Sequence, residues 1–279
     1  MRLFLLVALT MLAFAANSVL NRVALVDGAA GAASFAALRL LSGAVVLALL
    51  LVWRGHVSWW PDTAAGPLAL LAYVLGFSFA YVSLDAGLGA LILFGGVQVT
   101  MFAGALWRAE AVPPLRWAGA LLAFAGLVFL MWPSGALSVP LAGAGLMLVA
   151  AVGWGVYSLL GAGARDPLAA TARNFVWATP LALLMAAAFW DGMSTIGAVL
   201  AVVSGAVTSG LGYALWYKVL PSIPASVAAV AQLTVPILAL AGGLAFLGED
   251  VSWRFAVAAS MVLGGVALSL YRSKGSKAS

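Results

Sequence analysis

The ionisable side chains of this sequence lie between its apolar stretches rather than within them. All eight carboxylates fall in short connectors or at the ends of apolar runs, and the single histidine, His56, lies in a connector. Hydrolysis and metal binding need such groups to converge at one place, and the chain also has no cysteine. We therefore expect no enzyme activity, no cofactor and no metal site. The carboxylates are Asp27, Asp62, Asp85, Glu110, Asp166, Asp191, Glu249 and Asp250.

Uncharged polar and aromatic residues, by contrast, recur inside the apolar stretches and share helical faces. Gln98 lies about 18 Å along a helix from Glu110, near the middle of a bilayer core, and Gln232 lies about 25 Å from Glu249. An amide in hydrocarbon must find a partner, which can be a solute or a neighbouring helix. Tyr and Trp near membrane ends also serve as interfacial anchors. We predict that the solute-binding residues are Asn17, Ser78, Tyr81, Gln98, Trp154, Tyr157, Ser209, Tyr213 and Gln232.

A lining of amides, hydroxyls and aromatic faces suits a small neutral or zwitterionic solute with an apolar part. Phosphates and nucleotide sugars would need inward-facing Arg or Lys. Arg39 and Arg173 are the basic candidates within the stretches, and both lie near predicted helix ends. We expect these two side chains to extend toward the membrane surface, which disfavours phosphate-bearing solutes.

The composition requires a membrane. The chain has 279 residues, of which 65% are hydrophobic and only 8% are charged, against roughly 25% charged in a soluble domain. The 13 Lys and Arg are scattered between apolar runs and make no basic patch, so we expect no nucleic-acid partner. A membrane-spanning helix needs roughly 20 apolar residues. Ten such spans are predicted, at residues 3–21, 32–52, 64–83, 87–106, 114–131, 140–161, 170–190, 195–218, 222–247 and 252–271.

The sequence repeats itself after about half its length. A constant shift of 139 aligns residues 80–130 with 219–269 without a gap and places Glu110 on Glu249. A shift of 140 aligns residues 14–20 of the first span with 154–160 of the sixth. Fixed-period similarity of this kind indicates duplicated structural units. We predict one five-helix repeat over residues 1–132, a second over 140–272, and a polar cytoplasmic tail over 273–279.

The distribution of positive charge orients the two repeats. With the N-terminus in the cytoplasm and ten spans, ten of the 13 Lys and Arg lie inside, and Arg22, Arg39 and Arg254 lie outside. This bias obeys the positive-inside rule. Because five spans per repeat is an odd number, the second repeat is inverted relative to the first, as in many secondary transporters. The expected fold is an all-α membrane protein with ten transmembrane helices in two inverted five-helix repeats around a central cavity, with both termini cytoplasmic.

On these features the chain resembles the ten-helix EamA-type branch of the drug/metabolite transporter superfamily, and within it the bacterial amino-acid exporters, including those for aromatic amino acids. The resemblance rests on the two halves, on the turns at Leu84–Gly87 and Ile223–Ser226, and on the Glu that follows the fourth and ninth spans. It departs at Asp85, which stands where the family often has Pro. The resemblance implies that the first, third, fourth, sixth, eighth and ninth helices line the cavity, and that the second and seventh are peripheral.

Together these observations lead to the hypothesis of a multi-pass protein of the bacterial inner membrane that exports amino acids or related metabolites by alternating access. The missing mid-membrane acid favours uncoupled, facilitated transport. Export of drugs or nucleobases and proton-coupled antiport remain open, and a non-transporting membrane scaffold is the least favoured alternative. The expected partners are a small-molecule solute and membrane lipid, with the protein a monomer.

Overall fold

The computed structural model describes residues 2–55, 58–107, 114–132, 139–161, 164–219, 222, 231–232 and 234–270. These residues form helices joined by turns, and the only β pairing among them is an isolated bridge between Ala30 and Met193. The predicted all-α fold is therefore confirmed for the described part of the chain. The helices are α1 (Arg2–Val26), α2 (Ala32–Trp53), α3 (Ala65–Ala80), α4 (Ala86–Trp107), α5 (Pro114–Met131), α6 (Leu141–Gly161), α7 (Pro167–Ala188), α8 (Thr195–Val203), the π-helix η1 (Ser204–Leu211), α9 (Gly212–Val219), α11 (Thr234–Leu247) and α12 (Trp253–Leu270).

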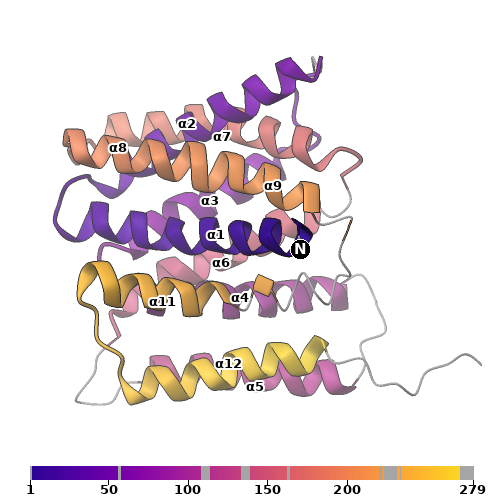
Figure 1. Cartoon of the computed structure of the whole chain (residues 1–279), viewed down its shortest axis with the longest axis vertical. Helices are drawn as coiled ribbons and strands as arrows, with labels where there is room; N and C mark the ends of the chain where they lie inside the picture. Colours follow the sequence, from indigo (N-terminus) through magenta and orange to yellow (C-terminus); the bar gives the residue numbers. More distant parts are fainter. Residues whose placement is uncertain are drawn as a thin grey trace, which may run out of the picture.

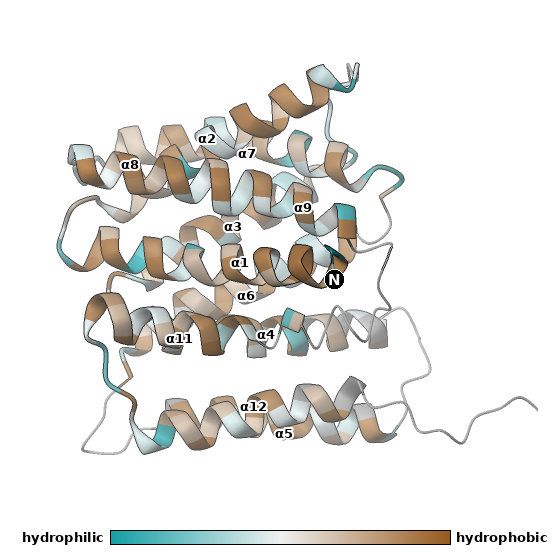
Figure 2. Cartoon of the chain, in the orientation of Figure 1, coloured by the Kyte–Doolittle hydropathy of each residue, from teal (hydrophilic) through white to brown (hydrophobic). Residues whose placement is uncertain are grey.

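Several helices have the length and composition of membrane spans. Within the described ranges five reach this standard, namely Arg2–Val26, Ala32–Trp53, Ala86–Gly104, Leu141–Gly161 and the continuous run Thr195–Trp216. Shorter apolar helices cover Ala65–Ala80, Trp117–Leu130 and Thr234–Leu247. In Figure 2 the polar residues lie mainly in the turns and at helix ends, and the helix bodies are apolar.

Local signals in the sequence define where these helices begin and end. Asp166 caps α7 by accepting a hydrogen bond from the Ala169 N–H at 3.1 Å, and Pro167 follows at the first helical position, where its missing N–H costs nothing. Gly248 ends α11 with φ +63°, a left-handed conformation that glycine adopts without a Cβ clash. The acidic and glycine-rich connectors of the sequence thus act as caps and stops.

The helices pack side by side, as Figure 1 shows. The closest pairs are α5 with α12, α3 with α6, and α2 with α7. Helix α1 lies between the α8–η1–α9 segment and α11, while α6 lies between α3 and α4. The α5–α12 pair forms one edge of the molecule (Figure 1). The interior between these pairs therefore receives side chains mainly from α1, α2, α3, α6 and the η1 region.

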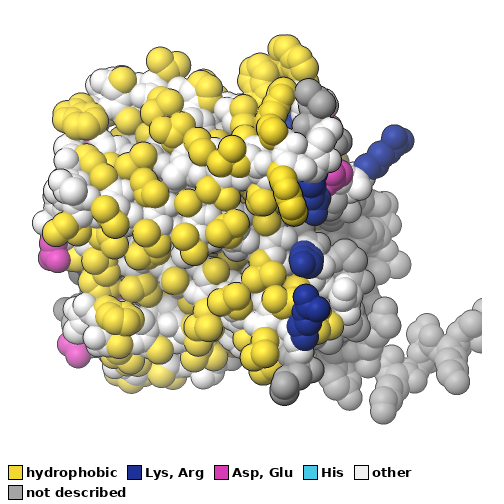
Figure 3. Space-filling view, turned by 45° about the horizontal axis from the view of Figure 1, so that its top comes forward, with side chains coloured by type: hydrophobic (Ala, Val, Ile, Leu, Met, Phe, Trp, Pro, Cys, Tyr) yellow, Lys and Arg dark blue, Asp and Glu magenta, His cyan; other side chains and the backbone are white. Residues whose placement is uncertain are grey.

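The outer surface is apolar. Leu49, Phe124, Leu184 and Phe246 are each more than half exposed, and Figure 3 shows apolar side chains over most of the face in view, with Lys and Arg gathered toward one end. A soluble monomer rarely exposes apolar patches this extensive. Lipid chains therefore solvate this surface, in agreement with the composition.

Candidate functional site

A buried polar cluster joins α1, α3 and η1. The Asn17 Oδ1 atom accepts hydrogen bonds from the Ser204 hydroxyl at 2.5 Å and from the Thr208 hydroxyl at 3.2 Å. One turn further along α1, the Asn21 Oδ1 atom accepts from the Ser78 hydroxyl at 3.1 Å, and the Asn21 amide donates to Ser204 Oγ at 3.5 Å. All five side chains are buried. Each thus finds the partner that a polar group needs inside an apolar bundle.

Arg39 of α2 is the centre of a second buried cluster. Its Nε atom donates to Ser209 Oγ at 3.2 Å, and its Nη2 atom donates to the Tyr73 hydroxyl at 3.1 Å. The guanidinium carbon lies 5.0 Å from the centroid of the Phe77 ring and 5.4 Å from that of Tyr73, within the range of cation–π attraction. Arg39 is only 1% exposed, and its Nη1 atom has no hydrogen-bond partner among the residues that the structure describes.

Arg39 also lacks a counter-charge among the described residues. The ion pairs between described residues are those of Arg22 with Asp85 and Glu249 and of Arg173 with Asp62, so no carboxylate in this part of the chain pairs with Arg39. Its partners are hydroxyls and ring faces, which are neutral. A guanidinium removed from water without an anion is costly, and Arg39 is therefore the least satisfied charge that the structure describes.

Two close helix contacts place the partners of Arg39. At Gly205 of η1, a Cβ atom would collide with the Arg39 carbonyl and the Ser42 hydroxyl, so glycine lets η1 approach α2 and brings Ser209 within reach. At Gly153 of α6, a Cβ atom would lie 2.7 Å from the Ala69 carbonyl oxygen, so glycine lets α6 approach α3. The π-helical geometry of η1, which is often found at functional sites, lets neighbouring residues of one helix face both α1 and α2.

Aromatic rings cover the cluster on the α6 side. The Trp154 ring centroid lies 4.8 Å from that of Tyr73, 5.1 Å from that of Tyr213 and 5.5 Å from that of Tyr157, with which it is stacked. Tyr213 also makes an edge contact with Phe14 at 5.7 Å. Trp154 is half-buried, whereas Tyr73, Tyr157 and Tyr213 are buried. The result is an aromatic wall beside a buried cation.

Six of the nine predicted site residues lie in the two buried clusters or in the aromatic wall beside them. They are Asn17, Ser78, Trp154, Tyr157, Ser209 and Tyr213. Tyr81 lies just beyond the end of α3, where its hydroxyl donates to the Ala86 carbonyl at 3.3 Å and its ring makes an edge contact with Phe77 at 4.7 Å. Gln98 and Gln232 are half-buried, and between described residues no hydrogen bond joins either of them to the clusters.

The expectation that Arg39 extends to the membrane surface is wrong. The side chain points into the bundle because hydroxyls and rings of α3 and η1 surround it, and α2 therefore contributes to the interior rather than lying wholly at the periphery. The argument against phosphate-bearing solutes, which depended on the absence of an inward-facing cation, therefore no longer holds. Arg173, by contrast, reaches the connector between α2 and α3, where its Nη2 atom pairs with both oxygens of the exposed Asp62, at 2.9 and 3.0 Å.

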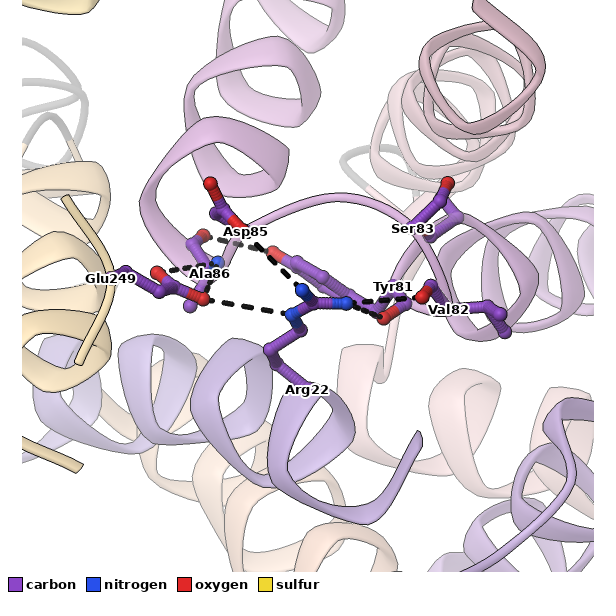
Figure 4. A network of polar contacts seen from close by, with 8 residues as sticks. Arg22, Tyr81, Val82, Ser83, Asp85, Ala86 and Glu249 are labelled. Atoms are coloured by element: carbon purple, nitrogen blue, oxygen red, sulfur yellow. Dashed lines mark hydrogen bonds and ion pairs between the residues drawn. The ribbon is translucent and has the colours of Figure 1, made fainter. Parts of the chain in front are cut away.

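At one end of the bundle, Arg22 of α1 binds two carboxylates (Figure 4). Its Nη2 atom lies 3.4 Å from Asp85 Oδ1, and its Nε atom lies 3.6 Å from Glu249 Oε1. Its Nη1 atom donates to the carbonyls of Tyr81 and Val82, both at 3.0 Å. The Arg22 cluster, defined here as Arg22, Asp85 and Glu249, therefore connects α1 to the α3–α4 and α11–α12 connectors.

Glu249 is the most buried carboxylate of the Arg22 cluster, with a side chain 6% exposed. Its two oxygens accept from the Ala86 N–H at 2.8 and 2.9 Å, so it caps α4 from a distant connector. Burial raises the pKa of Glu249 above its ordinary value of 4.5, and the hydrogen bond from the Ala86 N–H opposes this shift. The negative charge of Asp85 also raises the pKa, whereas the positive charge of Arg22 lowers it. The raised pKa shows that burial outweighs the stabilising contacts.

Pockets lie at both ends of the bundle. One, of about 640 Å³, is lined by Asp62, Gly66, Arg173 and Asn174 among others. Another, of about 480 Å³, is lined by Ser83 and the Arg22 cluster. Helix α3 passes from Gly66 in the first pocket, past Tyr73 beside Arg39, to Ser83 just beyond its end in the second. The buried Arg39 cluster thus lies between two openings along the same helix.

Comparisons with known proteins agree with this architecture. The model of the EamA-like transporter family matches residues 141–271. An uncharacterized protein of Pseudomonas aeruginosa is 49% identical over 276 residues, covering 96% of this chain and 94% of that protein. An uncharacterized transporter of Archaeoglobus fulgidus is 23% identical over 84% of this chain and 86% of its own length, and the uncharacterized transporter YwfM of Bacillus subtilis is 28% identical over 78% and 77%.

A solved crystal structure of a protein superposes with a TM-score of 0.63 at 20% identity, covering 94% of this chain and 97% of that one. At this identity the likeness speaks for the fold alone. The family model, the relatives named as transporters and the apolar helices together place function in the membrane. The chain belongs to the EamA-like transporter family of the drug/metabolite transporter superfamily and is a multi-pass membrane transporter.

Proposed function

We propose that this protein exports amino acids or related small metabolites across the bacterial inner membrane by alternating access, without coupling to the proton gradient. The observation that carries the proposal is the buried Arg39 cluster with its aromatic wall, which lies between pockets at the two ends of the bundle. A cation, hydroxyls and apolar rings in one place match a solute that is polar at one end and apolar at the other. Because the helices enclose Arg39 and leave it 1% exposed, we assign this conformation to an occluded step of the transport cycle.

An inverted repeat is part of this proposal, with units at residues 1–132 and 140–272, a cytoplasmic tail at 273–279, and ten spans. The packing supports it, because exchange of the two halves maps one helix contact onto another. The contact of α3 with α6 corresponds to that of the α8–η1–α9 segment with α1, and the contact of α4 with α6 corresponds to that of α11 with α1. Pairs α2–α7, α4–α11 and α5–α12 map onto themselves. Such symmetry gives a bundle two related conformations that open to opposite sides.

Uncoupled transport is proposed because the described carboxylates lie in connectors, at the ends of helices. The competing mechanism, proton-coupled antiport, finds its best candidate in Glu249, since its raised pKa and its contact with Arg22 connect protonation to one end of the bundle. Glu110, its partner in the sequence repeat, lies outside the described residues.

The test is solute uptake into liposomes that contain the purified protein. The panel comprises amino acids, nucleobases and a cationic drug, each measured with and without a pH gradient. Uptake of amino acids that is unchanged by the gradient is the expected result. Uptake of nucleobases or drug alone would overturn the substrate assignment, and strict dependence on the gradient would overturn the uncoupled mechanism.

A further inference from the structure

The partners of Arg39 differ in kind from those of the other arginines that contact the bundle interior. Arg22 pairs with two carboxylates and Arg173 with one. Arg254 donates to the backbone carbonyls of Phe129 and Trp132, at 2.7 and 2.8 Å. Arg39 alone among these four has only hydroxyls and ring faces around its guanidinium. The charge that would complete its surroundings must therefore come from outside the described chain.

A stabilising role does not account for this arrangement. Replacing a buried charge by an apolar side chain of similar size is often neutral or stabilising, and neutral hydroxyls compensate a guanidinium only in part. The arrangement does suit an anion, however. The Nη1 atom has no hydrogen-bond partner within the described part of the chain. The hydroxyls of Ser209 and Tyr73 accept from Arg39, so each keeps a proton that it can donate to an incoming oxygen.

The geometry around Nη1 favours a carboxylate on an organic solute over a bare inorganic anion. The cation is bounded by the rings of Tyr73 and Phe77, and Tyr73 contacts Trp154, which in turn contacts Tyr213. An apolar group attached to the carboxylate would meet these ring faces, where it gains by leaving water. A hydrated inorganic anion gains nothing from them.

We propose that Arg39 binds the carboxylate of the transported solute, with Ser209 and Tyr73 as additional donors and the Trp154–Tyr213 wall facing the rest of the molecule. The substrate class is thus small organic carboxylates, amino acids included, and the matching amides are excluded. This inference rests on the proposed function, since it names the group by which the exported solute is recognised. Because Arg39 is 1% exposed, binding requires the helices to separate, and the anion then neutralises the charge as they close.

The experiment compares each amino acid with its own amide in liposome uptake by the wild-type protein. Phenylalanine and leucine are each paired with the corresponding amide, and inorganic phosphate is a further arm. Arg39→Gln is expected to lower uptake of the acid at subsaturating concentration by about tenfold or more, the usual scale for a charged hydrogen bond. Arg39→Lys should retain part of it. Arg254→Gln, which removes another buried arginine away from the site, is the control for folding.

The outcomes are distinct. Selective uptake of the acids, lost in Arg39→Gln and retained in Arg254→Gln, supports the inference. Equal uptake of acid and amide by the wild-type protein overturns it while transport itself stands, and this arm needs no variant to fold. Uptake of phosphate lost in Arg39→Gln overturns it in favour of an inorganic anion. If no solute of the panel enters, the proposed function fails, and tryptophan fluorescence titrations with phenylalanine and its amide then decide the inference at the level of binding, since equal responses would overturn it.

Discussion

Arg22 and Arg39 lie on neighbouring helices, both largely out of water, yet they meet opposite surroundings. Arg22 finds two carboxylates and two backbone carbonyls at the end of α1, whereas Arg39 finds two hydroxyls and two rings inside the bundle. The first arrangement holds connectors together, since every charge has an opposite one beside it. The second leaves a cation uncompensated, which is the condition that a binding site for an anion needs and a structural ion pair lacks.

The largest effect is expected when Arg39 is made to resemble Arg22. Ser209→Asp places a carboxylate on the residue that accepts from Arg39 Nε, so the internal anion occupies the cation permanently. We expect uptake of carboxylate solutes to fall by about a hundredfold, on the scale of a lost charge pair, while thermal stability in detergent is maintained or increased. Ser209→Asn introduces a side chain of the same size without the charge, and its uptake of carboxylate solutes should fall much less. Full uptake by Ser209→Asp would show that Arg39 does not face the solute.

The second largest effect is expected when Arg22 loses the carboxylate of Glu249, one of its two counter-charges. Glu249→Ala leaves the Ala86 N–H without its cap and Arg22 without its most buried anion. We expect a loss of about 2–3 kcal/mol in the free energy of unfolding, because buried partners are left unsatisfied, measured by denaturation in detergent micelles. Asp85 is 49% exposed, so Asp85→Ala is the matched control, with an expected cost of about 0.5 kcal/mol. Equal losses would mean that burial of Glu249 contributes nothing.

A third, smaller effect is expected when Arg39 loses one of the two neutral hydroxyls that accept its hydrogen bonds. Tyr73→Phe removes the hydroxyl that accepts from Nη2 but keeps the ring beside the guanidinium and against Trp154. The expected result is a rise of about fivefold in the KM for a carboxylate solute, corresponding to one hydrogen bond, with little change in the maximal rate. Tyr213→Phe keeps its ring contacts with Phe14 and Trp154 and makes no hydrogen bond to Arg39. Its KM should therefore change less than that of Tyr73→Phe.

The sequence predicts the helices well, because apolar length and acidic or glycine-rich connectors are local signals. Asp166, Pro167 and Gly248 end or begin helices where their chemistry requires it. Asn17 and Ser209 were predictable as interior residues from helical periodicity, since a buried amide or hydroxyl on a shared face must find a partner. The family was also predicted from the sequence, because the resemblance to it covers nearly the whole chain.

The position of Arg39 could not be predicted in the same way. Distance from a helix end suggests that an arginine can reach the membrane surface, but the outcome depends on what faces it from α3 and η1. Those partners, Tyr73 and Ser209, lie far away in sequence, and Ser209 comes within reach of Arg39 because Gly205 allows η1 to pack closely against α2. A signal was present in the small residues around Arg39, since Ala36 and Gly43 share its face, which favours contact with a helix over contact with lipid. Glu249 was likewise predicted as a helix stop, and its role in capping α4 required tertiary structure.

The smallest expected effect is the pH dependence of stability that arises from protonation of Glu249, the carboxylate beside Arg22. Burial raises the pKa of this carboxyl above 4.5, so between 4.5 and the raised value the folded protein binds more protons than the unfolded chain. Its stability must therefore fall as the pH rises through this window, and the contribution is fully present below 4.5. Glu249→Gln cannot titrate, and the melting temperature of the wild-type protein relative to this variant should increase as the pH falls from 7 toward 4.5. A difference that is constant with pH would show that Arg22 and the Ala86 N–H balance the burial of the carboxylate, and the Arg22 cluster would then be a fixed ion pair without any response to acid.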